Sequence, residues 1–82
     1  MPGVKELILY STEGCHLCDE ALEVIRRALE EPCALTVVEI AHAPELLERY
    51  GVRIPVLRVE GESEELGWPF DAAAVQRFLA RV

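Results

Sequence analysis

The side chains of this sequence best suited to covalent chemistry are two cysteines three residues apart, Cys15 and Cys18, in the stretch GCHLC. Such a pair can cycle between a dithiol and a disulfide, contribute half of a metal site, or consist of two buried thiols without reactivity. A third cysteine, Cys33, makes the number odd, so the chain cannot pair all its cysteines internally. The elements that position the pair decide between these interpretations.

A strand and a helix are predicted on either side of the pair. The apolar run over residues 4–10 indicates a buried strand, and polar residues follow it. From His16 to about Leu29, apolar residues recur at intervals of three and four, which is typical of an amphipathic helix, and Pro32 is expected to stop it. Both cysteines therefore lie at the N-terminus of this helix.

The elements that follow continue an α/β pattern. A strand over residues 34–40 completes a βαβ unit, which requires a parallel pair of strands and a crossover helix. Pro44 suits the first turn of a short helix, and Gly51 suits the position just past its end. Residues 55–68 are typical of two strands joined by a turn at residues 60–62.

The last predicted strand carries acidic residues, and a final helix follows it. The second strand of the hairpin is expected to carry three charges that would discourage pairing with another chain at a sheet edge: Glu62, Glu64 and Glu65. Asp71 is expected to cap a last helix with the apolar face Val75, Phe78, Leu79 and Val82. The predicted order is β-α-β-α-β-β-α, a four-stranded mixed sheet covered by helices in one domain of residues 1–82.

With these elements, the sequence resembles the glutaredoxin-like family of the thioredoxin superfamily. The resemblance rests on STEGCHLC at the start of a helix and on RIPV before a hairpin, and the element order matches over nearly the whole chain. It implies a thioredoxin-like fold and thiol-disulfide oxidoreductase activity. The chain departs from the family pattern at the spacer, where His16 and Leu17 replace a proline-tyrosine pair, and before the last helix, where Gly67 replaces a Gly-Gly pair.

Thiol exchange requires a thiolate, and the helix N-terminus is the feature that favours one here. We expect Cys15, nearest the tip and the solvent, to be the nucleophile, and Cys18, on the same face and more buried, to resolve the mixed disulfide. Acidic neighbours such as Glu13 work against the thiolate, and His16 could help it when protonated or could be a solvent-facing spacer. Leu17 could offer apolar surface to a partner or pack in the helix stripe.

Pro55 is the second key position that the resemblance implies. In the family, the proline that opens this strand is cis and faces the C-x-x-C pair, and the backbone of the preceding residue, here Ile54, pairs with an extended thiol substrate. Arg53 could supply positive charge near Cys15 or be a solvated loop residue, and Trp68 could flank a substrate groove or cap the core. The candidate substrate-binding residues are therefore His16, Leu17, Arg53, Ile54 and Pro55.

Size and charge restrict the function classes. The chain of 82 residues has room for one domain. Its net charge of -7, from 8 basic and 15 acidic residues, disfavours binding to nucleic acid and to acidic membrane surfaces. The first ten residues hold too short an apolar run for a signal peptide or a membrane span. We therefore expect a cytoplasmic monomer.

The function predicted first is a thiol-disulfide oxidoreductase that acts on a disulfide-containing protein or a glutathione mixed disulfide. We expect no tightly bound cofactor, with glutathione or a reductase as the reductant. A zinc or iron-sulfur protein is an alternative. Only Cys33 and His42 remain as further ligands, so no metal is expected within one chain, and such a site would be shared between two chains with two ligands from each. A non-catalytic subunit that binds a partner is the other alternative.

Overall fold

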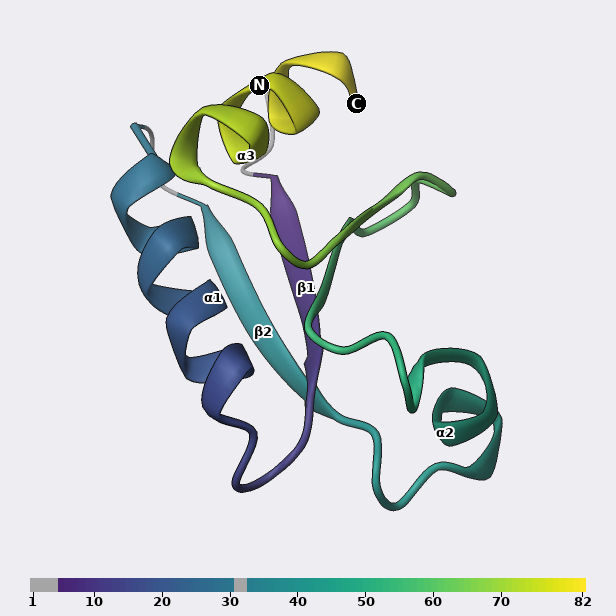
Figure 1. Ribbon diagram of the computed structural model, residues 1–82. Coiled ribbons are helices and arrows are strands. Elements are labelled where there is room, and N and C mark those ends of the chain that lie inside the picture. Colours follow the sequence, from purple (N-terminus) through teal and green to yellow (C-terminus); the bar gives the residue numbers. More distant parts are fainter. Residues whose placement is uncertain (1–4, 31–32) are drawn as a thin grey trace.

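The computed structural model describes residues 5–30 and 33–82, and these form helices and strands in the predicted order (Figure 1). The elements are β1 (Glu6–Ser11), α1 (His16–Ala28), β2 (Ala34–Glu39), α2 (Pro44–Tyr50), β3 (Val56–Val59), β4 (Glu65–Gly67) and α3 (Ala72–Arg81). The expected α/β, thioredoxin-like fold is confirmed. Val4 and Pro32, expected in the first strand and at the end of the first helix, lie outside the described residues.

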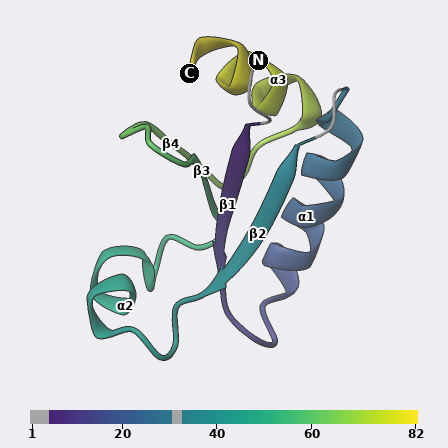
Figure 2. The ribbon, with the colours of Figure 1, turned by 180° about the vertical axis from the view of Figure 1, so that it is seen from behind.

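The four strands form one mixed sheet in the order β2-β1-β3-β4. β1 runs parallel to β2, with Ser11 opposite Glu39 at their C-terminal ends. β3 is antiparallel to β1 and β4, and its first residue, Val56, lies opposite Tyr10. Because a parallel pair needs a crossover, α1 returns the chain across one face of the sheet (Figure 2). The end of β1, the start of α1 and the start of β3 therefore lie at the same end of the sheet.

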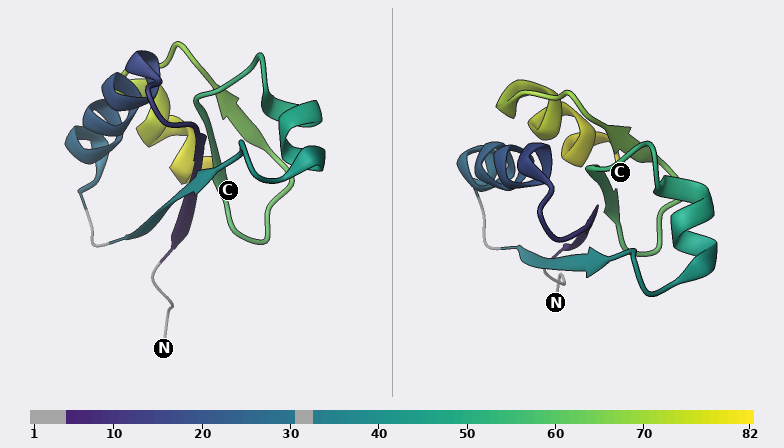
Figure 3. Two further views of the ribbon diagram at one scale, coloured as in Figure 1. Left: turned by 90° about the horizontal axis from the view of Figure 1, so that it is seen from below. Right: turned by 60° about the horizontal axis from the view of Figure 1, so that its bottom comes forward.

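One face of the sheet forms the main core with α1 and α3. Leu7 and Leu9 of β1 and Leu57 of β3 point to this face, and each is at most 1% exposed. The buried residues of α1 recur at intervals of three and four, as predicted: Cys18, Ala21, Ile25 and Ala28. α3 lies beside α1 and adds Val75 and Phe78 (Figure 3). Burial of each such large side chain stabilises the fold by about 1.5–3 kcal/mol.

α2 packs in a second, smaller cluster on the other face of the sheet. Its buried members are Tyr10, Ile40, Tyr50 and Val56. The rings of Tyr10 in β1 and Tyr50 in α2 stack with centroids 4.2 Å apart. The views in Figure 3 place α2 apart from α1 and α3. This arrangement fixes the segment after α2, which leads into β3, near the end of β1.

Two expected strand boundaries are wrong. Ser11, expected in the loop after the first strand, is the last residue of β1 and is 8% exposed, because the parallel pairing with β2 continues to this position. The second hairpin strand, expected to carry Glu62 and Glu64, begins only at Glu65. The Glu62 N–H donates to the Val59 carbonyl at 3.0 Å, which makes this stretch a turn rather than a strand.

Gly51 follows α2 as predicted, but its backbone is not left-handed. Its φ of -52° and ψ of -36° are right-handed helical values that any residue adopts. A Cβ at this position would come within 2.5 Å of the Leu47 carbonyl oxygen. The close approach of the backbone to Leu47, rather than an unusual φ, therefore requires glycine here.

The predicted cap of α3 is present and gives a test of the fold. Asp71 Oδ1 accepts a hydrogen bond from the Ala74 N–H at 2.8 Å. We expect Asp71→Ala to lower the free energy of unfolding by about 1 kcal/mol, because this N–H loses its partner. Asp71→Asn keeps an acceptor oxygen and should lower it much less. Urea denaturation measures both, and equal losses in the two variants would contradict a stabilising cap.

Candidate active site

A four-residue loop connects β1 to α1 and reverses the chain direction. The Cys15 N–H donates to the Thr12 carbonyl at 3.3 Å, which closes a turn. Gly14 within this turn has a φ of 74°, a left-handed conformation that residues with a Cβ rarely adopt. Apart from Gly14 itself and its two chain neighbours, no residue has an atom within 4 Å of where a Cβ would be, so the backbone conformation alone accounts for glycine at this position.

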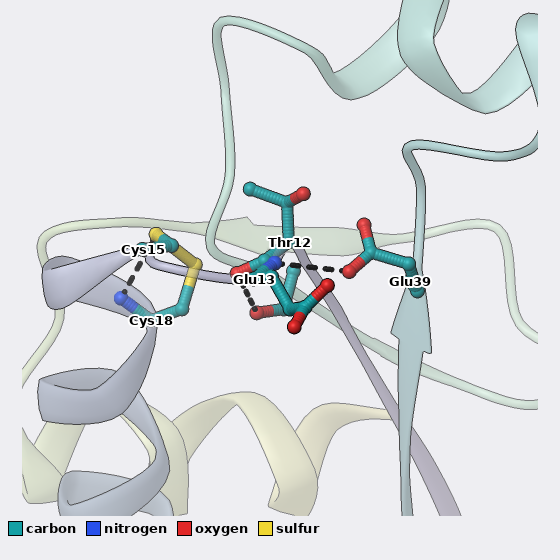
Figure 4. Close-up of a disulfide and its surroundings, with 6 residues drawn as sticks. Thr12, Glu13, Cys15, Cys18 and Glu39 are labelled. Atoms are coloured by element: carbon teal, nitrogen blue, oxygen red, sulfur yellow. Dashed lines mark hydrogen bonds between the residues drawn. A yellow bond between two sulfur atoms is a disulfide. The ribbon is translucent and has the colours of Figure 1, made fainter.

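Cys15 and Cys18 form a disulfide at the start of α1 (Figure 4). Their Cα atoms lie 5.2 Å apart, within the usual range for a disulfide. Cys18 is 3% exposed, whereas Cys15 is half-buried, so the predicted order of exposure is confirmed. Cys15 is thus the sulfur that an approaching molecule can reach.

Cys15 occupies the N-cap position of α1. The Cys18 N–H donates to Cys15 Sγ at 3.2 Å, in place of the oxygen that serine or aspartate supplies in most helices (Figure 4). In the reduced protein, the same N–H and the helix dipole would favour a thiolate at this sulfur. Asp19 is the acidic residue of the first turn and partly opposes this effect.

His16 and Leu17, the predicted contacts of a substrate, form the first turn of α1 between the two cysteines. Both side chains are exposed, and Leu17 is 47% exposed. Of the two interpretations of Leu17, apolar surface beside the disulfide is the one that its exposure supports.

The Ile54–Pro55 peptide bond is cis, as the resemblance implied. Pro55 is buried directly before β3, and Val56 lies opposite Tyr10, so the proline lies level with the end of β1 from which the Cys15 loop leaves. The Ile54 N–H donates to the Tyr50 carbonyl at 3.0 Å. This N–H is therefore already paired within the chain.

Arg53 lies beside Ile54, but its guanidinium is paired with a residue that sequence reasoning did not assign to the site. Arg53 Nη2 donates to Glu65 Oε1 at 2.6 Å, and the Tyr50 hydroxyl donates to Glu65 Oε2, also at 2.6 Å. Arg49 Nη2 lies 3.5 Å from the same carboxylate. Glu65, expected as a solvated edge charge, thus connects β4 to the segment that leads into Pro55.

Burial and hydrogen bonding change the acidity of this cluster. Burial, the hydrogen bond to Glu65 and the negative charge of this carboxylate raise the pKa of Tyr50 to about 12. Burial raises the pKa of Glu65, but hydrogen bonds from Tyr50 and Arg53 and the two arginine charges outweigh it, so this pKa lies below the usual 4.5. Glu65 is therefore ionised and Tyr50 neutral near pH 7.

Glu39 is a second residue that sequence reasoning missed. It is the last residue of β2, and Oε1 of its carboxylate accepts a hydrogen bond from the Glu13 N–H in the loop before Cys15, at 2.9 Å (Figure 4). The Thr12 hydroxyl and the backbone N–H groups of Ala41 and Glu13 hold the pKa of Glu39 below its usual 4.5. Alternation along β2 gave no signal for this contact, because it depends on the register with β1.

Two further sequence features, Trp68 and Cys33, are placed by the structure. Trp68 packs edge-on against Phe70 at the border of the main core, with centroids 5.0 Å apart. Cys33 is a free, half-buried thiol just before β2.

Within residues 5–30 and 33–82, no group of three or more His, Cys, Asp or Glu side chains could hold a metal ion. No helix of the described part of the chain is long and apolar enough to cross a membrane.

Known proteins share this fold and this chain length. A family model described as Glutaredoxin-like domain (DUF836) matches residues 6–80. The X-ray structure of protein XcR50 from X. campestris is 39% identical, with a TM-score of 0.83, and the match covers 93% of this chain and 97% of that one. Protein Ne2328 from Nitrosomonas europaea, solved by NMR, is 29% identical, with a TM-score of 0.78 and coverage of 95% and 94%.

A more distant neighbour shows the fold alone. The N-terminal domain of Synechococcus elongatus SasA is 20% identical, with a TM-score of 0.63, and the match covers 99% of this chain and 81% of that one. No curated protein matches the sequence.

The Glu65 cluster predicts a pH-dependent stability. We expect Glu65→Gln to lower the free energy of unfolding at pH 7 by about 1–3 kcal/mol, because the buried Tyr50 hydroxyl and Arg53 lose a charged acceptor. Since the folded pKa of Glu65 is lowered, its stabilisation is complete above the unfolded value and is lost as the pH falls through the folded one. The difference in free energy of unfolding between the unmodified protein and Glu65→Gln should therefore become smaller below pH 4.5.

The neighbouring Glu64 is a matched control, because it forms an exposed ion pair with Arg81 at 3.1 Å. Glu64→Gln should cost less than about 1 kcal/mol at pH 7. Denaturant unfolding at several pH values measures all three proteins. An equal cost for the two variants, or a difference for Glu65→Gln that does not change with pH, would refute the role given to this cluster.

Proposed function

The chain belongs to the family of glutaredoxin-like domains, and on this premise we propose that it is a thiol-disulfide oxidoreductase in which Cys15 is the nucleophile and Cys18 the resolving thiol. The observation that carries the proposal is the Cys15–Cys18 disulfide at the N-cap of α1, with the first sulfur accessible and the second buried. A structural disulfide would have no need of this asymmetry, whereas a redox cycle uses both features.

The proposed reaction transfers two electrons from the dithiol to a substrate disulfide. The Cys15 thiolate attacks one substrate sulfur, the substrate S–S bond breaks, and the other substrate sulfur leaves as a thiolate that takes up a proton. Cys18 then loses its proton and attacks Cys15 Sγ, which releases the second substrate thiol and forms the Cys15–Cys18 disulfide. Cys18 is suited to this step, because it lies one turn along the same helix face.

We propose that the substrate approaches between the first turn of α1 and the Ile54–Pro55 segment. His16 and Leu17 are exposed on one side of this approach, and Pro55 lies level with the end of β1 on the other. The Ile54 N–H is already paired with Tyr50, so its carbonyl is the backbone group we assign to an extended substrate. Arg53 acts in this proposal through its ion pair with Glu65, as a support of the segment.

The substrate class and the reductant follow from the same chemistry. We propose a disulfide-containing protein or a glutathione mixed disulfide as substrate, with regeneration by two glutathione thiols or by a reductase. No tightly bound cofactor is needed, because the two cysteines carry both electrons. We further propose that the protein works as a monomer in the cytoplasm, where such a reductant is present.

A trapping experiment tests the roles of the two cysteines. In Cys18→Ser, the mixed disulfide on Cys15 cannot be resolved, so it should accumulate and be detected by mass spectrometry of the intact protein. Glutathione on Cys15 would identify a glutaredoxin-type cycle, and a bound protein would identify a dedicated substrate. Cys15→Ser is the matched control and should trap nothing. If Cys18→Ser forms no mixed disulfide on Cys15 after incubation with a glutathione disulfide and with a protein disulfide, the oxidoreductase function is contradicted.

The N-cap geometry predicts an accessible thiolate. We expect the alkylation rate of Cys15 in the reduced protein to rise with pH about a midpoint below that of a free cysteine, about 8.5, because the Cys18 N–H stabilises the thiolate. The rate is followed at the Cys15 peptide by mass spectrometry, with Cys33 as the internal comparison. A midpoint at or above 8.5 would contradict the thiolate stabilisation.

A further inference from the structure

Glu39 lies where two loops leave the sheet together. β1 and β2 are parallel and end at the same level, with Ser11 opposite Glu39. The loop after β1 leads to Cys15, and the loop after β2 leads to α2. A side chain at the end of β2 can therefore contact the backbone of both loops.

The carboxylate of Glu39 bridges these loops with its two oxygens. Oε1 accepts from the Glu13 N–H and Oε2 from the Ala41 N–H, each at 2.9 Å. Figure 4 shows the carboxylate pointing to the backbone of the loop before the disulfide rather than to either sulfur. Two backbone donors need two acceptors, and a carboxylate is the side-chain group that offers acceptors alone.

The bridged loop has little else to hold it. Its own turn is closed by the Cys15 N–H, which donates to the Thr12 carbonyl at 3.3 Å, and the Ser11 hydroxyl of β1 donates to the same carbonyl at 3.5 Å. Apart from Ser11 of the adjoining β1, Glu39 is, among the described residues, the one side chain from another element that hydrogen-bonds to this loop. Its bond is made two residues before Cys15, so it restricts where the N-cap sulfur can lie.

We propose that Glu39 is a positioning residue, which holds the Cys15 loop so that Sγ stays at the N-cap of α1, on the Cys18 N–H. The inference rests on the proposed function. Reaction at a disulfide needs three sulfurs in line, and a misplaced nucleophile loses rate steeply. A carboxylate that acted only through its charge would have the opposite effect on the thiolate, because a nearby negative charge disfavours it.

The variant Glu39→Gln separates these two effects by sign. It keeps the size of the side chain but leaves one acceptor where two N–H groups need one each. If Glu39 positions the loop, the alkylation midpoint of Cys15 should rise toward about 8.5, because Sγ leaves the N-cap N–H. A midpoint that falls or stays unchanged would overturn the proposal, since loss of a charge alone lowers it.

Disulfide exchange gives the second readout. We expect the rate at which Glu39→Gln reduces a small disulfide such as hydroxyethyl disulfide to fall about tenfold, because alignment of the sulfurs is lost. The alkylation rate at high pH, where Cys15 is fully ionised, should stay unchanged. The exposed ionisable residues near Cys15 in the chain, Glu13, His16 and Asp19, are the same in all proteins compared.

Glu48→Gln is the matched control, because Glu48 is an exposed glutamate on α2 whose removal changes the net charge equally. It should keep the midpoint and the exchange rate of the unmodified protein. If the unmodified protein does not reduce disulfides, the proposed function fails, while the alkylation midpoints still decide the role of Glu39.

Amide hydrogen exchange tests the Glu39 bridge on the unmodified protein, so it does not depend on whether a variant folds. The amide protons of Glu13 and Ala41 lie in loops but donate to Glu39, so they should exchange with solvent at least about tenfold more slowly than an unprotected amide. Exchange at the unprotected rate would show that the bridge does not hold the loop and would overturn the proposal.

Discussion

The parallel pairing of β1 with β2 is the constraint on which the rest of the structure depends. Two parallel strands cannot be joined by a tight turn, so the chain must cross the sheet in a helix. The N-terminus of α1 is thereby placed at the end of the sheet where both strands finish. Cys15 lies at that helix end, and its N-cap hydrogen bond follows from its position in the chain. The same pairing brings Glu39 level with Ser11, which makes the carboxylate bridge feasible.

The two faces of the sheet support different parts of the candidate site. The face under α1 and α3 is apolar, and Cys18 is one of the buried residues of α1. The other face holds the stacked rings of Tyr10 and Tyr50 and, at its border, the carboxylate of Glu65. Glu65 ties β4 to the segment before Pro55 through Arg53. Each side of the candidate site thus has its own carboxylate, Glu39 on the loop before Cys15 and Glu65 on the segment before Pro55.

The sequence is informative wherever a local pattern decides the structure. The spacing of apolar residues in α1 predicted the face that carries the buried Ala21, Ile25 and Ala28, but it did not show that Leu17 is exposed. The cap at Asp71 was readable from its type and place. The cis bond before Pro55 needed the family resemblance, because few X-Pro bonds are cis. Glu39 and Glu65 were not readable, since their contacts depend on strand register and on side chains far away in the chain. For the same reason the sequence could not show that Arg53, expected either near Cys15 or in solvent, forms an ion pair with Glu65.

Cys33 has a consequence of a different kind. It lies just before β2, beyond the far end of a helix of 13 residues, which spans about 20 Å. It therefore remains a thiol while Cys15 and Cys18 are joined, so the chain presents one thiol when oxidised and three when reduced. The number of thiols per chain, measured on the folded or unfolded protein, therefore reports the oxidation state of the Cys15–Cys18 pair. Cys33 contributes one thiol in both states and serves as an internal reference.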